Sequence, residues 1–150
     1  MASSSPNVRV VVSALERFIE QVIKKITLDI VANLLRPGSE GGTPVDTGWA
    51  RSNWVPTLSV AASTEPAPQP GGLDKAATRA AVPGQEAAQQ AHVTLIATGY
   101  KLPFGDITIT NNVPYIVKLN DEGTRKAPRA FVQAAIRKAV TVDLPAGFGV

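Results

Sequence analysis

The chain contains no cysteine, so disulfide bonds and thiolate metal sites are excluded. Its one histidine, His92, rules out a multi-histidine metal site within a single chain. No run of about 18 apolar residues occurs, so we expect no membrane-spanning helix. The opening MASSSPNVRVVV lacks the successive charged, apolar and small-residue zones of a secretion signal. We therefore expect a soluble chain that is made in the cytoplasm.

An excess of charge of one sign is also lacking. The 150 residues include 15 Lys and Arg against 12 Asp and Glu, which gives a formal net charge of +3. Both ends are mildly basic and the middle is nearly neutral, which is weaker than the concentrated basic face of a DNA reader. A chain of this length fits one domain, residues 1–150, and can bury a core without covalent cross-links.

A long N-terminal helix is predicted by apolar residues that recur every three or four positions between residues 11 and 35. Its start is open between two positions. Ser13 and Glu16 form a capping box, which would leave Val8–Val12 as a short strand. Alternatively, the helix begins at Pro6, since proline suits the first helical position. The apolar face consists of Val11, Leu15, Phe18, Ile19, Val22, Ile23, Ile26, Ile30 and Leu34.

The middle of the chain predicts two strands and two helices. Thr57–Ala61 and the alternating run Ile107–Thr110 are typical of strands. Residues 74–81 and 85–97 are rich in alanine and are predicted to be helical, with Pro83-Gly84 breaking between them.

Two prolines are expected to begin helical segments near the C-terminus. Pro114 starts a turn that carries Tyr115 and ends at Gly123. Pro128 opens an amphipathic helix. The apolar residues of that helix are Phe131, Val132, Ala135, Ile136 and Val140.

Three segments are poor in large apolar residues and are predicted to be flexible, namely residues 1–7, 62–72 and 143–150. Together these elements predict an α+β fold. In this fold the long N-terminal helix and a C-terminal helix pack on a small, mostly antiparallel β-sheet, with a Pro/Ala-rich flexible loop.

Three arrangements look like catalytic groups but have simpler structural interpretations. Asp121 and Glu122 are adjacent before a turn glycine, where carboxylates are usually solvated. Asp46-Thr47-Gly48 has the letters of the aspartic-protease triplet but lacks the hydrophobic strands around it, so helix capping by Asp46 or Thr47 is favoured. His92 lies in an alanine-rich helix without a nucleophile elbow. We expect no enzyme, no cofactor and no bound metal.

The tryptophans and one arginine are candidate interface residues. Trp49 and Trp54 are five positions apart and do not share a helix face, so one can fill the core while the other reaches outward. Whether Trp49 belongs to the core or to an interface stays open. Arg51 lies between them and can stack on an indole or pair across an interface.

A basic cluster near the C-terminus is a further candidate. Arg125, Lys126 and Arg129 can neutralise two or three phosphates, which gives only weak and salt-sensitive affinity for DNA. No aromatic residues are interleaved to stack on bases. A solvated or interface linker is therefore favoured over a nucleic-acid site.

Two stretches, TPVDTGWARSNW (43–54) and ITNNVPYIVKLNDEGTRKAPRAFVQAAI (109–136), resemble the neck or tail-completion proteins of long-tailed bacteriophages, of the minor-tail-protein-Z type. The first stretch matches at Thr43, Pro44, Val45, Asp46, Thr47, Gly48, Arg51 and Trp54. The second matches at Asn111, Asn112, Pro114, Tyr115, Leu119, Gly123, Ala127 and Pro128. The order and separation of the two motifs also agree with that family.

The resemblance implies a structural virion protein without catalytic activity. It implies a small subunit that assembles with itself, as a ring with an expected six-fold symmetry, between the head connector and the tail tube or tail terminator. DNA would pass through the ring with non-specific contact only. Two alternatives stay open: a tail terminator that caps the tube, and a basic DNA-binding accessory protein.

Overall fold

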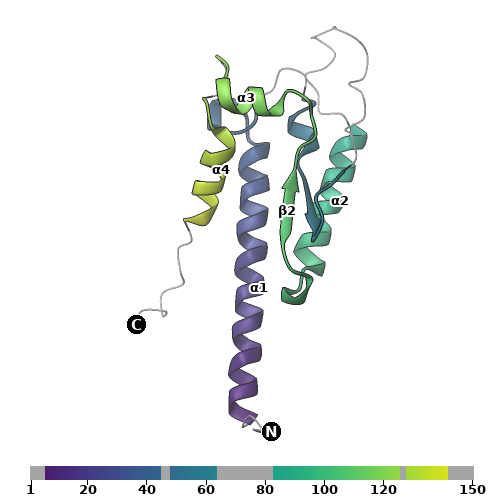
Figure 1. Ribbon diagram of the computed structural model, residues 1–150, viewed down its shortest axis with the longest axis vertical. Coiled ribbons are helices and arrows are strands. Elements are labelled where there is room, and N and C mark those ends of the chain that lie inside the picture. Colours follow the sequence, from purple (N-terminus) through teal and green to yellow (C-terminus); the bar gives the residue numbers. More distant parts are fainter. Residues whose placement is uncertain (1–5, 45–47, 64–82, 126–127, 142–150) are drawn as a thin grey trace.

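The computed structural model of the chain describes residues 6–44, 48–63, 83–125 and 128–141. Figure 1 shows the sheet between α1 and α2, with α4 on the other side of α1 and α3 across the end where α1 finishes. The structure confirms the α+β class, with helices packed on a small antiparallel sheet. The elements are α1 (Pro6–Leu35), η1 (Gly38–Glu40), η2 (Arg51–Asn53), β1 (Val55–Leu58), α2 (Pro83–Gly99), η4 (Leu102–Phe104), β2 (Ile107–Thr110), α3 (Ile116–Glu122) and α4 (Phe131–Val140).

Helix α1 contains 30 residues and is about 45 Å long. It begins at Pro6, the second of the two predicted starts, so Val8–Val12 are helical and do not form a strand. Pro6 and Asn7 therefore belong to the helix, although the sequence places them in a flexible segment; residues 1–5 lie outside the described part. No helix in the described residues is long and apolar enough to cross a lipid bilayer.

The apolar face of α1 is buried only toward the C-terminal end of the helix. Val31 and Leu34 have exposed fractions of 2% and 1%, whereas those of Val11 and Leu15 are 66% and 56%. Figure 1 shows the reason, because the first turns of α1 extend beyond the other described elements. The periodicity identifies the face, but the length of the helix exceeds the length of the body that covers it.

The two strands run antiparallel, and the register pairs Val55 with Thr110 and Leu58 with Ile107. Strand β2 has the predicted bounds, because its alternating Ile and Thr residues place one apolar side against the core.

Strand β1 begins and ends earlier than the predicted strand Thr57–Ala61. Ser59 takes a left-handed backbone conformation with φ of 62° and cannot continue an extended strand. Its N–H instead donates to the carbonyl of Asp106 at 2.8 Å, which closes this end of the sheet.

Helices α2 and α3 also differ in their bounds from the prediction. Helix α2 starts at Pro83 and includes the Pro83-Gly84 pair that was expected to separate two helices; residues 74–81 lie outside the described part. Helix α3 starts at Ile116, two residues after Pro114. It ends as predicted at Gly123, which has a φ of 70° and donates its N–H to the carbonyl of Leu119.

Helix α4 starts at Phe131, three residues later than the predicted start at Pro128. Ala130 just before it has a left-handed backbone, with φ of 58° and ψ of 36°, which prevents the helix from extending further back. Pro128 itself is exposed.

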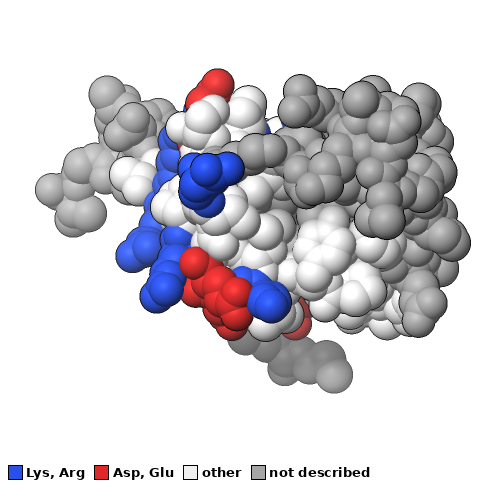
Figure 2. All heavy atoms as spheres, turned by 90° about the horizontal axis from the view of Figure 1, so that it is seen from above, with Lys and Arg blue, Asp and Glu red and all other residues white. Residues whose placement is uncertain are grey.

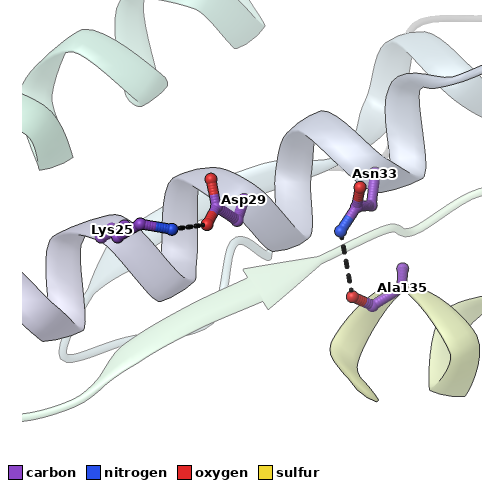
Figure 3. A network of polar contacts seen from close by, with 4 residues as sticks. All are labelled: Lys25, Asp29, Asn33 and Ala135. Atoms are coloured by element: carbon purple, nitrogen blue, oxygen red, sulfur yellow. Dashed lines mark hydrogen bonds and ion pairs between the residues drawn. The ribbon is translucent and has the colours of Figure 1, made fainter. Parts of the chain in front are cut away.

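The prediction that Ile136 and Val140 belong to the buried face of α4 is wrong, because they are 41% and 55% exposed. Phe131 and Ala135 of the predicted apolar set are buried, and Ala139, which was not predicted, joins them at the same spacing of four residues. The small alanines let α4 approach α1 closely, and Asn33 Nδ2 of α1 donates to the carbonyl of Ala135 at 3.3 Å (Figure 3).

The core lies between the C-terminal part of α1, α4 and the residues before β1. Its buried centre consists of Leu34, Trp54, Phe131 and Ala135. The partly buried apolar residues around it are Ile30, Leu35, Ile109, Ile116, Leu119 and Val132.

The loop that contains η4 is held against the middle of α1 by one carboxylate. Glu20 Oε1 accepts the N–H of Leu102 at 2.9 Å, and Lys101 Nζ lies 3.5 Å from Glu20 Oε2. The Leu102 N–H and then the Lys101 charge lower the pKa of Glu20, and partial desolvation opposes them. This contact is therefore strongest when Glu20 is ionised.

Candidate functional site

The two motif segments meet in space at the end of the molecule where α3 lies. Asn111 Nδ2 donates to the carbonyl of Ala50 at 2.7 Å. The rings of Trp49 and Tyr115 lie with centroids 5.7 Å apart and planes tilted by 57°. We call the described residues of segments 43–54 and 109–136 the motif end.

Trp54 anchors the motif end in the core and is therefore the one of the two tryptophans that fills it. It is 5% exposed and packs with Leu34 and Phe131. Its Nε1 donates to Thr43 Oγ1 at 2.8 Å, and Thr43 Oγ1 donates in turn to the carbonyl of Leu34 at 2.6 Å. The carbonyl of Leu34 belongs to the last turn of α1, where carbonyl groups have no partner within the helix. The motif thus supplies the hydrogen bonds that the end of α1 lacks.

The loop between α1 and Thr43 turns too tightly for a side chain at one position. Gly42 donates its N–H to the carbonyl of Pro37 at 3.1 Å. A Cβ atom on Gly42 would lie 2.0 Å from the carbonyl oxygen of Arg36, which is part of the backbone and cannot move aside. The glycine therefore brings Thr43 back to the end of α1.

The corner itself is a turn followed by the short helix η2. Among the described residues near Trp49, no helix longer than η2 begins. Gly48 is buried with a φ of 78°, which glycine adopts without strain. Its carbonyl accepts both the N–H and the hydroxyl of Ser52, at 3.0 and 2.7 Å. Asp46 and Thr47, the expected capping residues, lie outside the described residues.

The asparagines of the second motif bind the backbone of other segments. Asn111 Oδ1 accepts the N–H of Val113 at 3.1 Å, while its amide nitrogen reaches Ala50. Asn112 Nδ2 donates to the carbonyl of Ala62 at 2.7 Å. Asn111 therefore joins the two motif segments, and Asn112 joins the second segment to the chain that follows β1. Pro114 is exposed and precedes α3.

Two polar residues at this end were not found by sequence reasoning. Gln89 on α2 is 5% exposed, and its Nε2 donates to the carbonyls of Trp54 and Arg51 at 2.9 and 3.3 Å. Asn120 on α3 accepts the N–H of Val132 at 3.1 Å and so caps the start of α4 from another helix. Neither contact has a local sequence signal, because each partner lies many residues away.

The surface of the motif end is aromatic at its centre. Tyr115 is 38% exposed, and Trp49 beside it is half-buried, as is Arg51. Trp49 thus packs against Tyr115 and is not among the buried residues of the core cluster, and its place in an interface stays a prediction. Val117 of α3 adds an exposed apolar side chain, with an exposed fraction of 67%.

The charges near the aromatic surface are of both signs. Arg125 and Arg129 are exposed, and Lys126 lies outside the described residues. Arg129 Nε donates to the carbonyl of Glu122 at 3.2 Å, and the carboxylate of Glu122 lies 3.9 Å from Lys118 Nζ. Figure 2, which views this end, shows acidic and basic side chains interleaved along one side. The arginines therefore do not form a continuous basic face.

Among the described residues, no three His, Asp or Glu side chains lie close enough together to hold a metal ion. His92 is half-buried on α2. Asp121 and Glu122 are both exposed at the end of α3, as expected of solvated carboxylates.

In comparisons with known proteins, no family model, no curated protein and no solved structure matches this chain. The family suggested by the two motifs is thus not shown by these comparisons. Its implications for function stay predictions that depend on the motif residues and their arrangement.

Proposed function

We propose that this chain is a structural protein of the neck of a long-tailed bacteriophage, which completes the tail and joins it to the head connector. The observation that carries the proposal is the meeting of the two motif segments. They are far apart in the sequence, yet Asn111 binds the carbonyl of Ala50 and Trp49 lies against Tyr115. Motif residues that only maintained separate local turns would have no need to meet.

The motif end has the properties of a surface for binding another protein subunit. Tryptophan, tyrosine and arginine are enriched among residues that dominate protein–protein binding energy. Trp49, Tyr115 and Arg51 supply these groups, and Val117 adds apolar area. The backbone beneath them is held by Gln89 and the motif asparagines, so little order has to be gained on binding. We propose that this surface meets a neighbouring subunit or a connector protein in the virion.

DNA binding as the primary role is less well supported. Residues 118–129 carry four basic and two acidic side chains. One of the acidic residues, Glu122, pairs with Lys118 and accepts a hydrogen bond from Arg129 through its carbonyl. The charge left to neutralise phosphates is therefore small, and binding would be weak and steeply dependent on salt.

The proposal is tested by removing the protein from a phage that carries its gene. A nonsense mutation should yield separate heads and tails, and supplying the wild-type chain should restore joined particles. Trp49→Ala and Val117→Glu should restore few joined particles, since both change the motif-end surface. Ala97→Lys, on an exposed position of α2 eight residues beyond Gln89, is the matched control and should restore joining.

Electron microscopy of complete particles locates the chain along the particle axis. A position between the connector and the tail supports the proposal, and a position at the end of the tail tube alone supports the tail terminator. Normal particles formed without the protein, or particles that do not contain it, would refute both roles. Tight, salt-sensitive binding of the purified chain to DNA would favour the accessory DNA-binding protein.

A further inference from the structure

The N-terminal half of α1 carries an apolar stripe that no other described element covers. Val8, Val12 and Leu15 are 51%, 47% and 56% exposed, and half-buried Ile19 continues their line toward the core. We call these four residues the α1 stripe. Their spacing of four, three and four residues is that of the apolar seam of a coiled coil. Such a seam excludes water only when another helix lies along it.

The α1 stripe is apolar at each of its core positions. In heptad terms, Val12 and Ile19 occupy a positions, and Val8 and Leu15 occupy d positions. The partner helix needs a matching apolar seam, and a second copy of this chain provides one.

The charges beside the α1 stripe point to an antiparallel arrangement. Arg9 and Glu16 both follow a d residue, are exposed, and form no ion pair among the described residues. They lie seven residues apart, about 10 Å along the helix, and so cannot pair with each other. When two identical stripes run antiparallel, Arg9 of each copy faces Glu16 of the other. A parallel pair would instead set Glu16 against the apolar Val11 of its partner, so the charges select the antiparallel pair.

The same register fills both the seam and the surface beside it. Val12 faces Leu15 of the second copy, and Val8 faces Ile19, which gives four mixed layers related by two-fold symmetry. Glu16 borders a shallow depression of about 450 Å³ that has room for the Arg9 side chain of the second copy. The other residues around the depression are Glu20, Lys101, Leu102 and Pro103.

We propose that two copies of this chain pair through the antiparallel α1 stripe. A two-fold contact closes on itself and adds no third copy, so it differs from the contact that would build a ring. The motif end lies at the other end of α1 and stays free in the pair (Figure 1). The pairing therefore does not depend on the proposed role in the phage neck, and it describes the chain before it meets other proteins.

The pairing is tested by sedimentation velocity of the purified full chain over a wide range of concentration. The wild type should convert from monomer to dimer, and Leu15→Glu should remain a monomer with an unchanged helical circular dichroism spectrum. Val10→Glu is the matched control, because Val10 is 69% exposed on the same helix but faces away from the α1 stripe. It should dimerise like the wild type. A wild type that stays monomeric, or an oligomer that Leu15→Glu leaves intact, would refute the pairing.

Charge reversal tests the antiparallel register. Arg9→Glu places two like-charged pairs across the interface, and we expect it to raise the dissociation constant about tenfold. Glu16→Arg should act similarly. The double variant restores opposite charges at both pairs and should dimerise about as well as the wild type. Failure of the double variant to recover, with both single variants impaired, would exclude this register.

Discussion

A hydrogen-bonded chain from Trp54 through Thr43 to the carbonyl of Leu34 joins the first motif to the end of α1, and its energy can be measured by a double-mutant cycle. Thr43 and Trp54 are 0% and 5% exposed, so water cannot replace a lost partner. Thr43→Val keeps the shape of the side chain but leaves the indole N–H without an acceptor, which costs about 1–3 kcal/mol. In this variant the carbonyl of Leu34 still accepts the backbone N–H of residue 43, which lies 3.0 Å from it in the wild type.

Trp54→Phe removes the donor and leaves a small cavity between Leu34 and Phe131, so we expect a loss of about 2–4 kcal/mol. Trp54→Ala should cost about 3–5 kcal/mol, as other large-to-small changes in cores do. In the double variant Thr43→Val with Trp54→Phe, no buried N–H is stranded. Its loss should therefore be smaller than the sum of the single losses by about 1–2 kcal/mol.

Urea unfolding followed by far-ultraviolet circular dichroism gives each free energy of unfolding, independently of the changed tryptophan fluorescence. The matched control is Thr94→Val on α2, whose exposed hydroxyl donates to the carbonyl of Gln90 at 2.9 Å. Its effect should stay within about 0.5 kcal/mol. Single losses that add within about 0.3 kcal/mol would refute the claim that the two side chains act through their shared hydrogen bond.

Asn120→Ala should lower the free energy of unfolding by about 1 kcal/mol, because the start of α4 loses its capping acceptor, whereas Asn120→Asp keeps an acceptor and should lose less. Equal losses in urea melts of the two variants would contradict the capping role. For Glu20, the pKa is lower in the folded than in the unfolded chain, so its contribution is present above the unfolded pKa and lost as pH falls through the folded value. Glu20→Gln should therefore destabilise the chain near neutral pH and have little effect in strong acid; a loss of the same size in urea melts at both pH values would exclude the carboxylate as the cause.

Local patterns in the sequence predict where the helices and strands of this fold lie better than they predict which of their residues are buried. The alternation in Ile107–Thr110 and the glycine at 123 act within a few residues, and the structure agrees with both. The buried face of α4 depends on how closely α1 approaches. The contact selects Ala135 and Ala139 over the larger Ile136 because a small side chain lets the two backbones come together.

In the candidate site, too, some residues can be recognised from the local sequence and others cannot. Trp54 is a large apolar residue shortly before a predicted strand, which makes it a recognisable candidate for the core, and it is 5% exposed. The acceptors of Gln89 lie 35 and 38 residues away in sequence, and the alanine-rich helix around it gives no sign that this one glutamine is buried. Asn120 likewise caps a helix that begins eleven residues later. The turn before that helix has a left-handed backbone at Ala130, where a glycine would be the usual sequence signal.

The unequal covering of α1 means that its two halves belong to different cooperative units. The turns around Val31 and Leu34 can open only when the core opens, so their amide hydrogens exchange with solvent at the rate of global unfolding. The turns around Val8 and Val12 consist largely of β-branched valines, and no other described element packs against them. A short helical segment without such packing is only marginally stable in water. These first turns can therefore melt and re-form while the rest of the molecule stays folded, and a bound helix would convert them from a fraying end into part of the rigid body.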